Sequence, residues 1–282
     1  MAVPKVVGVA GGGRMGIGIA HAFLLAGAEV VVMEHDRDMA DAAGQRLTGA
    51  IHKSVERGVI ADAKGFIARA RYATDPGEFA GAGLVIEAVP EQLELKRDLL
   101  ARIESELDPV AWLASNTSSL SIDSLAEVLE RPERFCGLHF FNPVPSSELV
   151  EVVRGEQTDP TLITQAQKWV GAISKTAIVV CDSPGFASSR LGVVIALEAI
   201  RMVESGVATA ADIDAAMVLG YRFPVGPLRL TDMVGLDVRL GIAEYLEREF
   251  GSVFAIPPLL REMVEAGNLG RKSGQGFFEW DE

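Results

Sequence analysis

The sequence predicts an α/β fold in which a doubly wound, mainly parallel sheet is followed by an all-helical C-terminal domain. From residue 5 to about 182, short Val-rich runs alternate with amphipathic stretches, which is typical of buried parallel strands flanked by helices. A glycine-rich turn follows the first run. Beyond Asp182-Ser183-Pro184-Gly185 the apolar residues recur only at helical spacing. The expected domains therefore cover residues 1–184 and 185–282.

The expected strands are short, apolar and rich in valine, as buried strands are. They are Lys5 to Val9, Glu29 to Met33, Leu84 to Glu87, Trp112 to Ser115, Phe135 to Leu138, Val150 to Val153 and Ala177 to Val180. In the second domain, helical periodicity predicts helices at Leu191 to Glu204, Ala210 to Leu219, Val234 to Phe250 and Pro258 to Ala266.

The composition restricts the classes of partner. A formal net charge of −13 argues against binding to nucleic acid or to an anionic membrane, because both require a basic surface. No apolar run approaches the roughly 18 residues of a membrane span, and no leader pattern precedes the first strand, so we expect a cytoplasmic protein. Cys136 and Cys181 lie in apolar strand-like stretches, which predicts two buried thiols and neither a metal site nor a disulfide.

A phosphate-binding turn is predicted at Gly11-Gly12-Gly13-Arg14-Met15-Gly16, which matches G-x-G-x-x-G directly after the first strand and before a helical pattern. Gly11 permits the tight turn, Gly13 lets the backbone approach a pyrophosphate, and Gly16 permits close packing of helix on strand. Glu34 ends the second strand, where an acid accepts the ribose hydroxyls and repels a 2′-phosphate. The turn predicts a Rossmann-like domain that binds NAD rather than NADP.

Two polar motifs, Ser115-Asn116-Thr117-Ser118-Ser119-Leu120 and His139-Phe140-Phe141-Asn142-Pro143-Val144-Pro145, follow predicted strands, where doubly wound sheets bind their ligands. Together with further motifs they closely resemble the signatures of the short-chain L-3-hydroxyacyl-CoA dehydrogenases. These motifs are Leu149-Val150-Glu151-Val152, Pro184-Gly185-Phe186, Thr231 to Asp237 and Gly270-Arg271-Lys272-Ser273-Gly274. The resemblance covers the whole chain. It implies a homodimer that oxidises L-3-hydroxyacyl-CoA to 3-oxoacyl-CoA with NAD, in fatty-acid or related acyl-CoA metabolism.

The residue types fit this chemistry independently, because oxidation of a secondary alcohol needs a base for the hydroxyl proton. His139 is the expected base, since it alone of the four histidines lies at a strand end among the polar motifs. Glu151 lies in an apolar Val-Glu-Val run, where an unpaired carboxylate is costly, so it needs a cationic partner. By the logic of hydrolase triads it orients the imidazole, and the resemblance implies the same pair. Because the base must begin neutral, oxidation should slow as the pH falls.

Other roles come from the resemblance alone. It implies that Ser118 hydrogen-bonds the substrate oxygen near C3 and borders both cofactor and substrate. Asn142 is expected at the nicotinamide end, while Glu91, Lys96 and Lys272 match cofactor contacts of the family. Asn116 is expected to satisfy loop backbone instead. For Glu91 and Lys96 a solvated helix start remains the alternative interpretation.

The chain departs from the family in two places. Where the family has an asparagine that helps bind the substrate oxygen, this chain has Ser189, whose hydroxyl donates a hydrogen bond but reaches less far. Ser146-Ser147-Glu148 replaces a more apolar, lysine-bearing stretch that the resemblance places near the acyl path. Both departures indicate an unusual acyl group or a changed rate.

A basic segment offers a binding surface for the negatively charged CoA. Residues 46–71 contain six basic side chains against two acidic ones, among them Lys53 and Arg57, which lie one helical turn apart. Arg57 falls near a CoA-contacting lysine of the family. The alternative is a solvated charged face.

Two rival functions remain open. One is a dehydrogenase of a non-CoA hydroxy acid, such as a sugar-acid or carnitine-like compound, on the same fold. The basic segment and the His139 motif argue against it. The other is a non-catalytic nucleotide-binding or structural protein, which would most simply lack the pair of His139 and Glu151. The acyl chain length, and the choice between CoA and an acyl carrier protein, also stay open.

Overall fold

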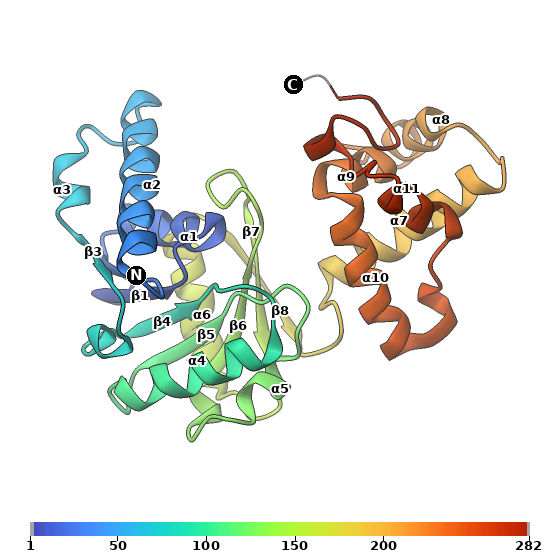
Figure 1. The fold of residues 1–282 in the computed structure, drawn as a ribbon. Helices are drawn as coiled ribbons and strands as arrows, with labels where there is room; N and C mark the ends of the chain where they lie inside the picture. Colours follow the sequence, from blue (N-terminus) through green and yellow to red (C-terminus); the bar gives the residue numbers. More distant parts are fainter. Residues whose placement is uncertain (1–2, 281–282) are drawn as a thin grey trace. The chain divides into compact units, whose positions relative to one another are not determined.

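The computed structural model describes residues 3–280 and divides into two compact units, Met1–Ser183 and Pro184–Glu282. Unit 1 contains a sheet with its helices, and unit 2 is built of helices (Figure 1). The predicted fold class, a mainly parallel doubly wound sheet followed by an all-helical domain, is confirmed. Among residues 3–280, no helix combines the length and the apolar character needed to cross a membrane.

Unit 1 is built on one eight-stranded sheet with the order β3-β2-β1-β4-β5-β6-β7-β8. The strands are β1 (Val6–Ala10), β2 (Glu29–Met33), β3 (Ala70–Ala73), β4 (Leu84–Glu87), β5 (Trp112–Ser115), β6 (Phe135–Phe140), β7 (Leu149–Arg154) and β8 (Thr176–Cys181). Neighbouring strands are parallel except β6 and β7, which pair antiparallel. The strand order reverses between β1 and β4, which is the point where doubly wound sheets bind their ligands.

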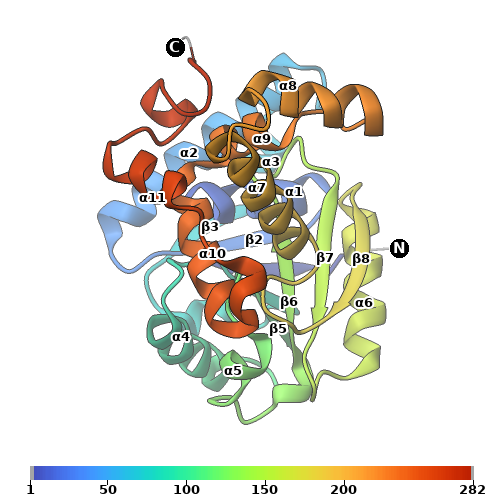
Figure 2. The same cartoon turned by 90° about the vertical axis from the view of Figure 1, so that its right-hand side faces the viewer.

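Helices cover both faces of the sheet. They are α1 (Arg14–Leu25), α2 (Arg37–Glu56), α3 (Lys64–Ile67), α4 (Leu93–Glu106), α5 (Ile122–Ala126) and α6 (Pro160–Ala172). Phe23 of α1, Leu47 of α2 and Trp169 of α6 belong to one buried core with the strands. Figure 2 shows α6 on one side of strands β5 to β8 and α4 and α5 on the other. The strands are therefore buried between two layers, as their apolar sequences require.

Three details of unit 1 differ from the sequence predictions. Strand β3 was not predicted, because Ala70-Arg71-Tyr72-Ala73 is a half-polar edge strand without an apolar run. Strand β6 extends to Phe140, so His139 lies inside the strand rather than after it. Cys136 is buried, which raises its pKa to about 12, but the prediction for Cys181 was wrong. Cys181 is exposed because β8 is the edge strand of the sheet.

Unit 2 contains α7 (Ser188–Glu204), α8 (Ala210–Ala215) with a π-helical turn at Ala216–Gly220, α9 (Pro227–Val234), α10 (Leu236–Phe250) and α11 (Pro258–Glu265). Leu197, Leu228 and Leu246 lie in its buried core. The helix predicted from Val234 to Phe250 begins later, because Gly235 adopts a φ of +106° and separates α9 from α10. The C-terminal segment is fixed by buried Asp232, which accepts hydrogen bonds from the backbone of Phe277 and Phe278.

Candidate active site

The glycine turn between β1 and α1 divides its glycines into two kinds. A Cβ on Gly16 would lie 1.8 Å from the carbonyl oxygen of Gly11, and Gly11 has a φ of +101°. The fold itself therefore requires glycine at both positions. Gly13 is different: its φ is −67°, and a Cβ there would meet no atom of the chain within 4 Å. An exposed glycine that packing does not require, at the N-terminus of a helix, suits the close approach of a phosphate.

Glu34, directly after β2, is tied to the same turn. Its Oε1 accepts a hydrogen bond of 2.7 Å from the backbone nitrogen of Gly12. A Cβ on Gly12 would lie 3.0 Å from that oxygen and 2.5 Å from Cβ of Ala43, so this glycine is also required by packing. The turn and the carboxylate are thus held together before any ligand binds. These residues fit the dinucleotide that the sequence predicts, with the helix terminus toward its phosphates and Glu34 toward its ribose.

The register of the parallel strands aligns the remaining polar motifs. Ala10 of β1 pairs with Glu87 of β4, Glu87 with Ser115 of β5, and Ser115 with Gly137 of β6. Strands β1, β4 and β5 all end at this row, whereas β6 continues beyond it. The loops that follow β1, β4 and β5 therefore begin at one edge of the sheet, where β6 continues past Gly137 to His139 and Phe140.

His139 and Glu151 form a buried pair across the antiparallel strands β6 and β7. They are direct partners in the strand register. His139 Nδ1 lies 2.7 Å from Glu151 Oε2, and the side chains are only 7% and 0% exposed. Because a carboxylate accepts the hydrogen bond, the imidazole proton is on Nδ1, and Nε2 is the nitrogen that can take up a proton. The ring of Phe141 packs 4.5 Å from the imidazole.

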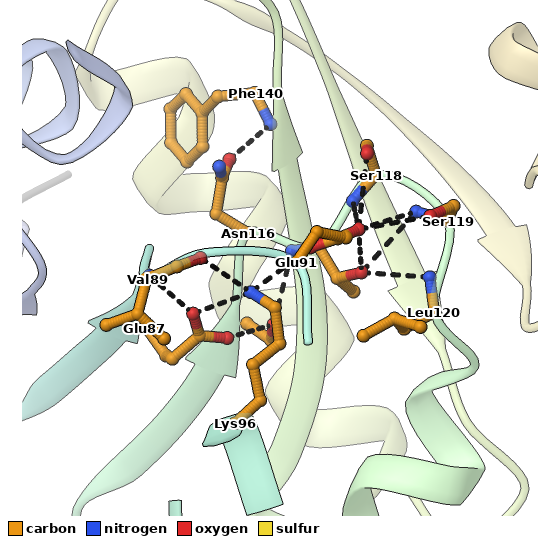
Figure 3. A network of polar contacts seen from close by, with 11 residues as sticks. Glu87, Val89, Glu91, Lys96, Asn116, Ser118, Ser119, Leu120 and Phe140 are labelled. Atoms are coloured by element: carbon orange, nitrogen blue, oxygen red, sulfur yellow. Dashed lines mark hydrogen bonds and ion pairs between the residues drawn. The ribbon is translucent and has the colours of Figure 1, made fainter. Parts of the chain in front are cut away.

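A second buried ion pair, between Glu87 and Lys96, supports the loops after β4 and β5 (Figure 3). Lys96 Nζ lies 2.7 Å from Glu87 Oε1, with side chains 1% and 0% exposed. The second carboxylate oxygen of Glu87 accepts a 2.6 Å hydrogen bond from the hydroxyl of Ser115. Lys96 is thus no solvated residue of a helix start, and in this structure its ammonium is directed to Glu87, to Glu91 at 3.2 Å and to the carbonyl of Val89.

Glu91 connects this pair to the loop that carries Ser118. Its Oε1 accepts hydrogen bonds from the Thr117 hydroxyl at 2.6 Å and from the backbone nitrogens of Ser118 and Ser119 at 2.8 and 3.1 Å (Figure 3). Both serine hydroxyls lie 3.2 Å from the same oxygen. Burial raises the pKa of the Glu91 carboxyl, but the charge of Lys96 and these hydrogen bonds outweigh it and hold the pKa below its usual value.

Two asparagines have different positions. Asn116 Oδ1 accepts a 2.9 Å hydrogen bond from the backbone nitrogen of Phe140, so it satisfies backbone as predicted, but of β6 rather than of its own loop. This bond ties the loop after β5 to the last residue of β6, which follows His139 in the sequence (Figure 3). Asn142 is exposed on the turn after β6, and its peptide bond to Pro143 is cis.

The basic segment of residues 46–71 is only partly available to a ligand. Arg69 donates to the carbonyls of Leu24 and Ala28, and Arg71 lies 3.8 Å from Glu78. Lys53, in the last turn of α2, and Arg57, its C-cap, are exposed. The two residues predicted to bind CoA are therefore accessible cations.

Two predicted residues, Ser189 and Lys272, lie in unit 2. Ser189 is half-buried in the first turn of α7. Lys272 Nζ lies 2.5 Å from both carboxylate oxygens of Asp237 on α10. Burial raises the pKa of Asp237, but the hydrogen bond and charge of Lys272 and the backbone hydrogen bonds together outweigh it, so the pKa lies below its usual value. The lysine is thus held by an intra-unit ion pair.

Comparison with known proteins decides the family. The model of the NAD-binding domain of 3-hydroxyacyl-CoA dehydrogenases matches residues 6–183, and that of their C-terminal domain matches residues 185–280. The chain belongs to the 3-hydroxyacyl-CoA dehydrogenase family. This confirms the predicted family, the prediction of an NAD-dependent enzyme, and NAD as its cofactor.

Similar proteins match over nearly the full length. A probable 3-hydroxybutyryl-CoA dehydrogenase of Deinococcus radiodurans is 42% identical over 279 residues, covering 97% of this chain and 99% of its own. A 3-hydroxybutyryl-CoA dehydrogenase of Mycobacterium tuberculosis is 41% identical over 282 residues, covering 97% and 98%. The crystal structure of (S)-3-hydroxybutyryl-CoA dehydrogenase from Ralstonia eutropha matches with a TM-score of 0.94 at 36% identity, covering 99% of this chain and 100% of that one.

Glu87 and Ser115 are site residues of this family member that were not predicted. The signal for Glu87 was an acid that closes the apolar run Leu84-Val85-Ile86, followed by Lys96 in the next helix. An acid in such a run needs a cation, as the argument for Glu151 already assumed. Their place in the network makes them positioning residues for the loop of Ser118.

The two kinds of glycine predict opposite effects of one added methyl group. Gly16→Ala should destabilise the protein by several kcal/mol or prevent folding, because its Cβ overlaps the Gly11 carbonyl. Gly13→Ala should lose at most about 1 kcal/mol, as a poorer N-cap, but weaken NADH binding at least tenfold. Urea denaturation and NADH fluorescence titration measure both. Unchanged NADH affinity of Gly13→Ala would contradict the placement of the phosphates.

The buried pair predicts a large cost for removing the lysine. Lys96→Met should destabilise by about 3–5 kcal/mol in urea denaturation, because Glu87 is left buried without a counter-ion. The double variant Glu87→Gln/Lys96→Met should recover most of that loss. Arg97→Met is the matched control, since its carboxylate partners Glu94 and Glu127 are exposed, and it should cost about 1 kcal/mol or less. Equal losses for Lys96→Met and Arg97→Met would exclude this interpretation.

Proposed function

We propose that this chain catalyses the reversible oxidation of an L-3-hydroxyacyl-CoA to the 3-oxoacyl-CoA with NAD, with His139 as the general base. The observation that carries the proposal is the buried 2.7 Å contact of His139 with Glu151 at the ligand-binding edge of the sheet. The names of the three relatives described above, each a 3-hydroxybutyryl-CoA dehydrogenase or a probable one, support a short acyl chain. An intact pair argues against a non-catalytic relative.

In the oxidative direction, Nε2 of His139 accepts the proton of the C3 hydroxyl. NAD, which the turn from Gly11 to Gly16 and Glu34 would hold, would supply the acceptor for the hydride of the same carbon. The carboxylate of Glu151 holds Nδ1–H and stabilises the imidazolium that forms. In the reductive direction the imidazolium returns the proton to the oxygen. One proton and one hydride leave the substrate, so the step balances without a metal ligand or a further acid.

The other residues bind and orient. The hydroxyls of Ser118 and Ser189 are assigned to the C3 oxygen. The turn from Gly11 to Gly16 and Glu34 are assigned to NAD, together with Asn142 and Lys272. For Glu91 and Lys96, the network supports a shared role: they fix the loop of Ser118 and present an ordered carboxylate to the cofactor.

A dimer through unit 2 is part of the proposal. On α9 and α10 the side chains of Met233, Val234 and Val238 are 49%, 40% and 43% exposed. Apolar side chains gathered on neighbouring helices are typical of an interface between subunits.

Replacing the proposed base should remove turnover without removing the cofactor. His139→Ala should lower kcat for NADH oxidation with acetoacetyl-CoA by about 10²–10⁴-fold, because no other group supplies the proton. Glu151→Gln should also lower kcat, since an amide does not stabilise the imidazolium. NADH affinity, measured by fluorescence, should stay within about threefold in both variants, because neither residue belongs to the glycine turn.

Two outcomes would count against the proposal. Full activity of His139→Ala would exclude the histidine as the base. A wild-type protein that binds NADH but does not turn over acetoacetyl-CoA would favour a non-CoA hydroxy acid of the sugar-acid or carnitine type.

The accessible cations at the end of α2 predict the CoA contacts. The variant Lys53→Glu/Arg57→Glu should raise KM for acetoacetyl-CoA about tenfold or more with little change in kcat, because it replaces attraction to the CoA phosphates by repulsion. The control substrate is acetoacetyl-pantetheine, which lacks the nucleotide phosphates, and its KM should not change. An equal rise for both substrates would place the CoA phosphates elsewhere.

A further inference from the structure

Arg239 of α10 is a buried cation without a counter-ion. The residue is only 8% exposed, and its Nε is buried with no hydrogen-bond partner. Within residues 3–280, no carboxylate lies within ion-pair distance of its guanidinium. Burial lowers the pKa of Arg239 to about 10, and no acidic group offsets this effect. At neutral pH the side chain is therefore still charged.

A charge in this position is unfavourable for the fold alone. Taking a cation out of water without a partner costs several kcal/mol, and apolar residues of similar volume are often more stable in its place. The other buried charges are satisfied within the chain: Lys96 and Glu87 pair with each other, and Asp214 and Asp232 accept hydrogen bonds from backbone N–H groups. A guanidinium presents a planar set of donors that matches a carboxylate or phosphate in two parallel hydrogen bonds. The missing partner is therefore a planar or tetrahedral oxyanion supplied by a ligand.

The position of the guanidinium indicates which part of the ligand it faces. It lies against α7 at Gly192, where an added Cβ would be 3.2 Å from Nη1 and 3.8 Å from Nη2. A glycine inside a helix costs about 1 kcal/mol, and Gly192 has no unusual φ that would require it, so its role is to leave room. Ser189 precedes Gly192 by three residues and so lies on the same face of α7, one turn away.

We propose that Arg239 binds a carboxylate at the far end of the acyl group, so that the preferred substrates are CoA esters of 3-hydroxy dicarboxylic acids. This inference rests on the proposed function, because it takes Ser189 as a ligand of the C3 oxygen. The guanidinium lies beside Gly192, which is one turn of α7 from that serine. From there it would reach a carboxylate a few carbons beyond C3. The serine, shorter than the asparagine of the family, leaves space for such a chain. A phosphate of CoA has similar chemistry, but it lies on the other side of the thioester.

The test uses two substrates of equal chain length, 3-oxoadipyl-CoA, which ends in a carboxylate, and 3-oxohexanoyl-CoA, which ends in a methyl group. The wild-type ratio of kcat/KM should favour the carboxylate, and Arg239→Met should reduce that ratio by about 10- to 100-fold. Arg190→Met is the matched control on α7, because Arg190 is exposed and stacks on Phe250, and it should keep the wild-type ratio. A ratio that is the same in wild type and Arg239→Met would overturn the proposal.

A binding measurement separates this inference from the proposed function. Adipate should raise the melting temperature of the wild-type protein and not that of Arg239→Met, whose own melting temperature should equal or exceed the wild-type value. Turnover of 3-oxohexanoyl-CoA without preference for 3-oxoadipyl-CoA and without a shift by adipate would refute the role of Arg239 alone. Absence of turnover with both substrates, with the adipate shift intact, would refute the proposed reaction and keep the anion site. A KM that rises in Arg239→Met for 3-oxohexanoyl-CoA but not for its pantetheine thioester would assign Arg239 to a CoA phosphate and overturn the acyl carboxylate.

Discussion

The antiparallel pairing of β6 with β7 is the constraint on which the site depends. It places His139 directly opposite Glu151, so the distance between the two side chains follows from the strand register. A slip of one residue would turn one of them to the other face of the sheet. Both strands are buried, and a slipped register would leave the buried carboxylate of Glu151 away from the imidazole, so the native register is favoured. The chain therefore positions His139, the proposed base, by sheet geometry rather than by a loop.

The pair of Glu87 and Lys96 positions the loops after β4 and β5, as the strand register positions His139. A buried carboxylate with both oxygens bonded leaves the following backbone little freedom, since Val89 and Ser115 donate to it as well. Glu91 in turn restrains Ser118, because its Oε1 accepts hydrogen bonds from the backbone nitrogen and the hydroxyl of that residue. Once desolvation is counted, the buried pairs Glu87–Lys96 and His139–Glu151 contribute little net stability. Their role is explained by the order they impose on the site.

Features that depend on local sequence were predictable, and features that depend on partners across the fold were not. The glycine turn and the strands carry their signal within a few residues, and so does the family likeness. Asn116 was predicted to satisfy backbone of its own loop, but its bond goes to Phe140 of β6, 24 residues away. The partner of Lys272 on α10 was not predicted, because an ion pair between distant segments leaves no periodic pattern. The exposure of Cys181 depends on β8 being an edge, which composition does not reveal.

The buried charges of Glu151, Glu87 and Arg239 differ in how the cost of their burial is offset, and the difference is informative. Glu151 and Glu87 each lie at hydrogen-bond distance from a basic side chain, so their cost is met inside the chain before a ligand arrives. Such pairs preorganise a site and do not select among ligands. Within residues 3–280 no carboxylate lies within ion-pair distance of Arg239, and we propose that its cost is met when an anion binds. An unpaired charge such as that of Arg239 discriminates between substrates, because a neutral ligand does not reduce the free-energy cost of burying the guanidinium.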